Sequence, residues 1–124
     1  MVEREITVLT DVALITCIVQ KGMADKIVRA SREAGAQGAT VYYAQGSGVR
    51  ERLGLLGVAI EVEKEVINIV VATNQVDRLV EVIYLAGQLD KPGRGFLYVT
   101  PLEKAATYIP PDILERLSAR AEQQ

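Results

Sequence analysis

The sequence predicts an α+β domain in which one strand–helix–strand unit is used twice on a single antiparallel sheet. Residues 15–35 and 67–87 match at a constant offset of 52 residues without a gap, for example Asp25 with Asp77, and both end in Ala-Gly. Each segment contains a β-prone run, a short turn and an amphipathic stretch, and a second β-prone run follows each. This βαβ-βαβ order is that of the ferredoxin-like split arrangement, which places both helices on one face of the sheet.

The first unit starts with the apolar run 15–19, continues with a helix, and ends with a strand over 39–44, "ATVYYA". Its helix has a small apolar stripe, formed by Ile27, Ala30, Ser31 and Ala34. Gly35 follows this helix, as a glycine often does at a helix end. The lone cysteine, Cys17, lies inside the apolar run and is expected to be a small core residue.

The second unit repeats this order, with a helix before Gly87 and a strand over 96–100, "FLYVT". Its helix has apolar residues at i, i+3, i+4, i+7 and i+10, namely Val76, Leu79, Val80, Ile83 and Ala86. Asn74 is expected to cap this helix, with Asp77 favoured in its first turn by the helix dipole. The sheet face away from the helices is expected to carry Val, Ile, Cys and Tyr side chains. Tyr42, Tyr43 and Tyr98 are expected to be sheet and interface residues. Such a face needs a cover, so we expect an oligomer.

Composition excludes several classes of function. The chain has 49% hydrophobic and 24% charged residues and a net charge of -2, so no global basic field favours nucleic acid. It has one Cys and no His, so a zinc, copper or haem site is not expected. We find neither a signal-peptide pattern nor an apolar run long enough to insert into a membrane, and we expect a cytoplasmic protein.

The most informative stretch is "QLDKPGRGF", residues 88–96, which lengthens the second unit relative to the first. It sets Lys91 and Arg94 among Pro92, Gly93 and Gly95. Backbone N–H groups freed by glycine, with nearby cations, suit a phosphate or another anion. Two further segments have this character, Gly46-Ser47-Gly48-Val49-Arg50 and Lys64.

Other candidates are open to two interpretations. Glu61, Glu63 and Glu65 alternate with apolar residues and are predicted to be a solvated strand face in preference to paired catalytic carboxylates. The long connection 46–62 exposes or packs three leucines, Leu53, Leu55 and Leu56. If they are exposed, they form a patch for docking a partner. No Ser/His/Asp set or metal cluster is present in the sequence, so we do not expect an enzyme.

The chain resembles the PII signalling proteins and their PII-like relatives over residues 15–112. The resemblance rests on "GATVYYAQGSG", "GVAIEVEKEVINIVVATNQVDRLVEVI" and "PGRGFLYVTPLEKA" and on their spacing. It implies a homotrimer that binds adenine nucleotides between subunits. It also implies a T-loop at about 47–62, which regulates a partner protein such as a membrane transporter, and a B-loop at about 91–95, which wraps the phosphates.

Carried over by position, the resemblance implies a nucleotide site. Its residues are Gly38, Thr40, Gly46, Gly48, Arg50, Lys64, Lys91, Gly93, Arg94 and Gly95. Gly38 and Thr40 match residues next to the adenine and ribose, and Lys64 matches a lysine near the terminal phosphate. The ligands that PII-like relatives use are AMP, ADP, ATP or cyclic di-AMP, with Mg or a small anion such as bicarbonate as a further signal.

The chain departs from the standard pattern at its cations. The T-loop-base arginine falls on Val49, the B-loop acid becomes Arg94 and the following lysine becomes Phe96. In the C-terminal loop the two phosphate-binding arginines fall on Thr107 and Ile109. We therefore expect AMP or ADP to compete well with ATP. Two other hypotheses stay open: a CutA-like structural or metal-tolerance trimer, against which the 88–95 insertion counts, and a slow nucleotide hydrolase using Glu61 or Glu63.

The two ends exceed the resemblance. Residues 1–14 form a β-prone extension that is expected to lengthen the first strand or cover a sheet edge. Residues 113–124 are expected to form a short helix or tail after Pro110-Pro111.

Overall fold

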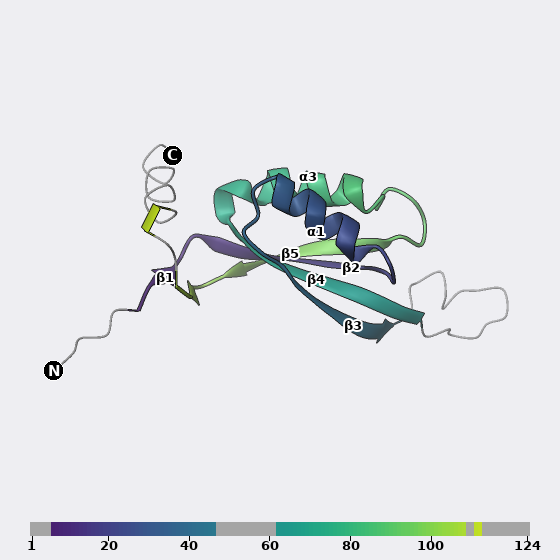
Figure 1. Ribbon diagram of the computed structural model, residues 1–124, viewed down its shortest axis with the longest axis horizontal. Helices are drawn as coiled ribbons and strands as arrows, with labels where there is room; N and C mark the ends of the chain where they lie inside the picture. Colours follow the sequence, from purple (N-terminus) through teal and green to yellow (C-terminus); the bar gives the residue numbers. More distant parts are fainter. Residues whose placement is uncertain (1–5, 47–61, 109–110, 113–124) are drawn as a thin grey trace.

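Four antiparallel strands form the central sheet of the structure, a computed structural model that describes residues 6–46, 62–108 and 111–112 of the 124-residue chain. Across the sheet the strands are β3 (Thr40–Gly46), β4 (Val62–Ala72), β2 (Val12–Gln20) and β5 (Gly95–Leu102). The helices α1 (Ala24–Glu33) and α3 (Val76–Ala86) lie over one face of this sheet (Figure 1). The helices follow β2 and β4, and β3 and β5 come after them, so the predicted ferredoxin-like arrangement is confirmed.

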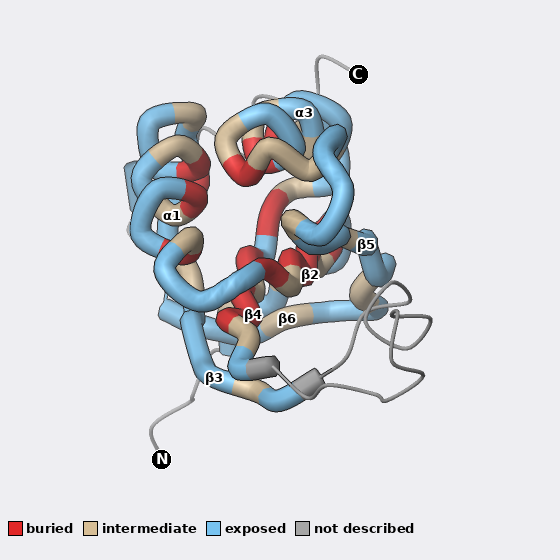
Figure 2. Tube along the Cα trace, turned by 90° about the vertical axis from the view of Figure 1, so that its right-hand side faces the viewer, coloured by how far each residue is buried: buried red, intermediate tan, exposed pale blue. Residues whose placement is uncertain are grey.

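The core lies between the helices and the sheet, where Figure 2 shows the buried residues facing one another. Apolar side chains from the two central strands and both helices fill it: Ile15, Cys17, Val19, Ile27, Ile67, Ile69, Leu79 and Ile83. Cys17 has no exposed surface, as its apolar surroundings in the sequence predict. Burial also raises the pKa of its thiol from 9.0 to about 11, because the charged thiolate is disfavoured away from water.

The opposite face of the sheet is open, and it is more apolar than an ordinary solvent-facing surface. Large side chains on this face keep between 45% and 56% of their surface exposed: Tyr42, Val70, Phe96 and Tyr98. The rings of Phe96 and Tyr98 stack with their centroids 6.0 Å apart. Cys17 does not lie on this face, contrary to the prediction, because the side chains of β2 alternate and Cys17 shares the helix side with Ile15 and Val19.

The internal repeat has a direct structural counterpart. Thr16 lies opposite Asn68 in the β2–β4 ladder, and these two residues are also 52 positions apart, which is the offset of the repeat. The Thr16 hydroxyl donates to the Asn68 side-chain oxygen at 2.8 Å. A residue that pairs with its own repeat partner marks the local twofold axis, so this axis passes between the two central strands at Thr16 and Asn68.

The two helices end as their glycines predict, but α3 begins differently. Gly35 follows α1 with φ at 107°, and Gly87 is the C-terminal cap of α3. Asn74 does not cap α3: it lies within a 3-10 turn, η1 (Thr73–Gln75), and the helix begins after Gln75 without a side-chain cap. The prediction was wrong because the chain tightens by one turn before it enters the helix.

The N-terminal residues lengthen the ladder between β2 and β5. Short strands β1 (Val8–Leu9) and β6 (Ala105–Ala106) pair with Leu9 opposite Ala105, and β2 and β5 pair with Val12 opposite Leu102. Between these two pairs the chain advances by three residues on each side, from Leu9 to Val12 and from Leu102 to Ala105. The pairing register is therefore unchanged across the break. The strand β2 itself begins at Val12, three residues before the predicted start of the repeated unit.

The helices α1 and α3 have 10 and 11 residues. In the ranges that the structure describes, no helix has the length and apolar character required to cross a membrane.

Candidate functional site

The predicted anion-binding segments that the structure describes lie at one end of the sheet. The strand β3 ends at Gly46, β4 starts at Val62, β2 ends at Gln20 and β5 starts at Gly95. Figure 1 shows the connection from α3 to β5 at this same end. The antiparallel topology therefore gathers the two predicted loops, which are far apart in the sequence.

The strand β2 separates the two sets of cations. Lys64 of β4 lies opposite Gln20, and Gly95 of β5 lies opposite Val19. Because neighbouring strands are spaced by about 4.8 Å, the backbones of β4 and β5 are about 10 Å apart here. At that spacing, side chains from β4 and from the insertion before β5 can both reach an anion held across the end of β2.

The insertion at 88–95 is a built turn with an unusual backbone. Gln88, Gly93 and Gly95 all have positive φ, at 53°, 77° and 136°. The N–H of Lys91 donates to the carbonyl of Gln88 at 3.0 Å, and the N–H of Arg94 to that of Lys91 at 3.4 Å. Gly95 has to be glycine on two counts, since a Cβ there would also collide with the carbonyl oxygen of Ile18 on the neighbouring strand.

The cations Lys21, Lys91 and Arg94 at this end of the sheet differ in whether they form an ion pair. Lys21 forms an ion pair with Glu63 at 3.2 Å, with both side chains largely exposed. Lys91 is exposed and Arg94 is half-buried, and neither has a carboxylate within ion-pair distance among the residues that the structure describes. The turn therefore presents two cations to an external anion. In the described ranges no three carboxylate or thiol side chains come together as metal ligands would.

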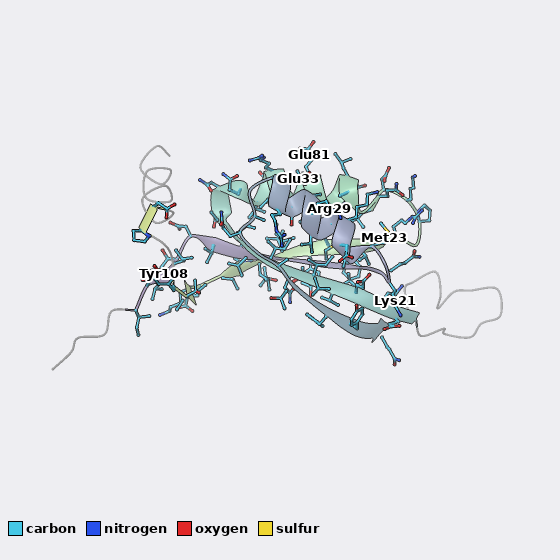
Figure 3. All side chains as sticks on the ribbon, in the orientation of Figure 1. Lys21, Met23, Arg29, Glu33, Glu81 and Tyr108 are labelled. Carbon is cyan, nitrogen blue, oxygen red and sulfur yellow. The ribbon has the colours of Figure 1, made fainter. Side chains whose placement is uncertain are left out.

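Two contacts at the β2–α1 turn were not predicted from the sequence. The side-chain amide of Gln20 donates to the carbonyl of Gly93 at 2.6 Å and so ties β2 to the insertion. Lys21, the residue after Gln20, is joined to β4 by its ion pair with Glu63. Figure 3 shows Lys21 and Met23 at this end of the molecule and Tyr108 at the opposite end. Neither contact has a signal in the sequence, because both join segments more than 40 residues apart.

The prediction that Glu61, Glu63 and Glu65 form a solvated strand face is wrong for Glu65. Its side chain is buried, and one carboxylate oxygen accepts the backbone N–H of Gly22 and, at 3.4 Å, that of Ala24. These N–H groups belong to the N-terminus of α1, which lacks a side-chain cap of its own. Glu63 is engaged with Lys21, so the structure gives no support to these two carboxylates as a catalytic pair, and Glu61 lies outside the described residues.

The remaining predicted site residues divide into two groups. Gly38 and Thr40 lie at the start of β3, and Gly46 at its end, so about 20 Å of strand separates them within one chain. The structure therefore does not bring Gly38 and Thr40 to the loop cluster of the same chain. Other predicted or compared positions lie outside the described residues: Gly48, Val49, Arg50, Leu53, Leu55, Leu56 and Ile109. Thr107 is described, and its side chain is exposed.

A second concave region lies along the outer side of α1 and against β3. Its lining mixes both signs of charge with two valines: Asp25, Val28, Arg29, Arg32, Glu33 and Val41. None of the predicted site residues belongs to this lining, so it is not part of the candidate site.

This geometry defines a ferredoxin-like domain in which cationic, glycine-containing loops meet at one end of the sheet. The family model for nitrogen regulatory protein P-II matches residues 12–109, which is most of the chain. The chain therefore belongs to the P-II family, whose members are signal-transduction regulators, and the resemblance found in its motifs is confirmed.

The fold is also similar to that of a solved structure, "Crystal Structure of Arabidopsis thaliana PII bound to citrate". The TM-score is 0.61 and the sequence identity 20%, over 76% of this chain and 79% of that chain. At this identity the likeness supports the fold alone.

Proposed function

We propose that this protein is a PII-type regulator that binds an adenine nucleotide through its phosphates at the loop cluster. The observation on which the proposal rests is the position of Lys64 and the 88–95 insertion on the two sides of the end of β2. Lys91 and Arg94 would meet the phosphate from the insertion and Lys64 from β4, with the glycine backbone between them. The proposed activity is binding without catalysis.

The site would be completed in a homotrimer. Gly38 and Thr40, which resemble residues next to the adenine and ribose, lie about 20 Å from Gly46 along β3 of the same chain. A nucleotide held between neighbouring subunits would meet these residues from one chain and the loop cluster from the other. The open apolar face of the sheet would be covered in the same assembly.

The preferred ligand follows from the cations that the chain lacks. Thr107 stands where the standard pattern has a phosphate-binding arginine, and each such contact is worth about 1.5–3 kcal/mol. AMP and ADP are therefore expected to compete with ATP, and cyclic di-AMP is a further candidate. Bicarbonate is the proposed co-signal, since a small anion suits the same cationic loops.

The regulated partner would be a protein such as a membrane transporter, docked through the T-loop at about 47–62. Leu53, Leu55 and Leu56 are the proposed contact residues of that segment. They lie outside the described residues, so this part of the proposal rests on the sequence.

A calorimetric titration with AMP, ADP, ATP and cyclic di-AMP, with and without bicarbonate, tests the proposal. We expect saturable binding near one ligand per subunit, and about 10-fold or greater weakening of ATP in Arg94→Ala, since a charge-assisted contact is lost. Arg32→Ala, an exposed arginine in the last turn of α1, is the matched control and should bind as the parent does. A folded protein that binds no member of the panel would refute the nucleotide proposal. Hydrolysis of ATP during the titration would refute binding without catalysis.

A further inference from the structure

Gln20 is the last residue of β2 and lies between the two sets of cations in the loop cluster. It pairs across the sheet with Lys64, and its side-chain amide reaches the other way, to the carbonyl oxygen of Gly93 in the insertion. At 2.6 Å this hydrogen bond is short for an amide donor. It joins residues 73 positions apart, so it fixes the position of the insertion relative to the sheet.

The hydrogen bond engages a peptide unit that controls the direction of both cations in the turn. In a trans peptide the carbonyl of Gly93 and the N–H of Arg94 point in opposite directions. The carbonyl accepts from Gln20, and the N–H donates to the carbonyl of Lys91 at 3.4 Å. This one peptide is therefore held at both of its polar groups, with Lys91 on one side and Arg94 on the other.

The turn has need of such a restraint. Lys91, Pro92 and Gly93 are all exposed, and Gly93, which has no Cβ, can leave its φ of 77° at little steric cost. A loop that has to order itself around each anion binds more weakly than one held in place beforehand, because ordering costs conformational entropy.

We propose that Gln20 is a positioning residue for the phosphate of the bound nucleotide, acting through the Gly93 carbonyl to hold Lys91 and Arg94 in their binding orientation. The inference rests on the proposed function and adds to it a residue of the β2 strand that touches no ligand. An uncharged amide suits this role, because it donates to the carbonyl without competing with the phosphate for the neighbouring cations.

The test compares Gln20→Ala, Gln20→Glu and Gln20→Lys with the parent, using ATP and adenosine as the two probes. The measured quantity is the dissociation constant for adenosine divided by that for ATP. This ratio isolates the part of the affinity that the phosphates supply. Gln20→Ala should lower this ratio about 3- to 10-fold, as expected for one hydrogen bond. Gln20→Glu should lower it further, because a carboxylate cannot donate and adds negative charge. Gln20→Lys restores a donor and adds a positive charge, so its ratio should be at least that of the parent.

The chain offers a matched control in Gln37, whose side-chain amide also donates to a glycine carbonyl, that of Gly35, at 3.4 Å. Gln37→Ala removes the same kind of contact beyond the other end of α1 and should leave the ratio unchanged.

The outcomes separate the two proposals. If the parent binds ATP more tightly than adenosine and Gln20→Ala keeps that advantage in full, the role of Gln20 is refuted and the proposed function stands. If Gln37→Ala lowers the ratio as much as Gln20→Ala does, the effect is general and the positioning role is refuted as well. A parent protein that binds none of AMP, ADP, ATP and cyclic di-AMP more tightly than adenosine refutes both.

Discussion

Glu65 has two roles that the sequence pattern does not separate, since it is a strand residue and also the cap of a helix from another segment. Its carboxylate accepts two backbone N–H groups at the start of α1, where the helix dipole also favours negative charge. The alternation of Glu61, Glu63 and Glu65 predicts one exposed face. The structure buries the last of them because the β2–α1 turn folds over it.

Replacing Glu65 by Ala should therefore destabilise the fold through the loss of its buried hydrogen bonds. We expect a loss of about 1–3 kcal/mol in the free energy of unfolding, because two N–H groups lose their acceptor in a buried place. Glu65→Gln keeps one acceptor oxygen and should lose less. The control is Glu63→Ala, which breaks an exposed ion pair and should cost under about 1 kcal/mol. Urea unfolding at one protein concentration measures all three, and equal losses for Glu63→Ala and Glu65→Ala would contradict the capping role.

Cys17 gives a prediction about pH. Burial raises the pKa of its thiol from 9.0 to about 11, so the folded state keeps the proton in a range where the unfolded chain releases it. The contribution of this group to stability is complete below pH 9 and falls as the pH rises toward 11, by about 2–3 kcal/mol in all. The comparison of the parent with Cys17→Ala isolates this slope from other titrating groups.

Urea unfolding of both proteins between pH 8.5 and pH 11 measures the difference directly. A thiol reagent at neutral pH should also react with Cys17 only after unfolding, because the native thiol is both buried and protonated. Identical pH slopes for the two proteins would show that the thiol titrates alike in the folded and unfolded states.

At the scale of elements, the insertion at 88–95 depends on one close approach between strands. Gly95 begins β5 at a φ of 136°, and a Cβ there would meet the backbone of Ile18 and, at 3.0 Å, the Cα of Val19. Both obstacles are main-chain atoms in the central strand of the sheet, which cannot move aside as a flexible side chain can.

Gly95→Ala should therefore shift the start of β5 and with it the insertion. We expect a loss of about 3 kcal/mol or more in stability, from backbone strain and the displaced ladder. Gly38→Ala is the matched control, because Gly38 has no neighbouring atom within 4 Å of the added methyl group and no positive φ. Thermal unfolding of both variants distinguishes them, and a Gly95→Ala protein as stable as Gly38→Ala would show that β5 adjusts freely.

The elements themselves were predictable because their signals are local. The 52-residue repeat and the helical spacing of residues such as Leu79 and Ile83 identify both helices and the four strands of the central sheet, although β4 begins before the predicted unit. The N-terminal cap of α1 was not predictable, since the acceptor for its first N–H groups comes from Glu65, 41 residues away. For the same reason the sequence identifies Lys91 and Arg94 in the candidate site but not Gln20.

At the scale of the whole molecule, the two faces of the sheet differ in what covers them. The helices cover one face and bury its odd-numbered residues on β2, such as Ile15 and Val19. The other face has a hydrogen-bonded polar pair, Thr16 and Asn68, on the local twofold axis, with exposed apolar side chains around it. A surface of this composition on a folded monomer is typical of an interface between subunits.

Val70 lies on this open face, where it is 45% exposed and pairs opposite Leu14. A charge at an exposed position costs a monomer little, whereas the same charge buried in an interface is strongly unfavourable. Val70→Asp should therefore stay folded and fail to form the proposed trimer.

Leu85→Asp is its control, because Leu85 is a large apolar residue with 63% exposure on the helical side of the molecule. Sedimentation velocity should give three times the 13.5 kDa chain mass for the parent and for Leu85→Asp, and a lower mass for Val70→Asp. If Leu85→Asp dissociates and Val70→Asp does not, subunits associate through the helices. The open face would then be free in the oligomer, and a nucleotide site between subunits could not join Gly38 and Thr40 to the loop cluster in the way proposed.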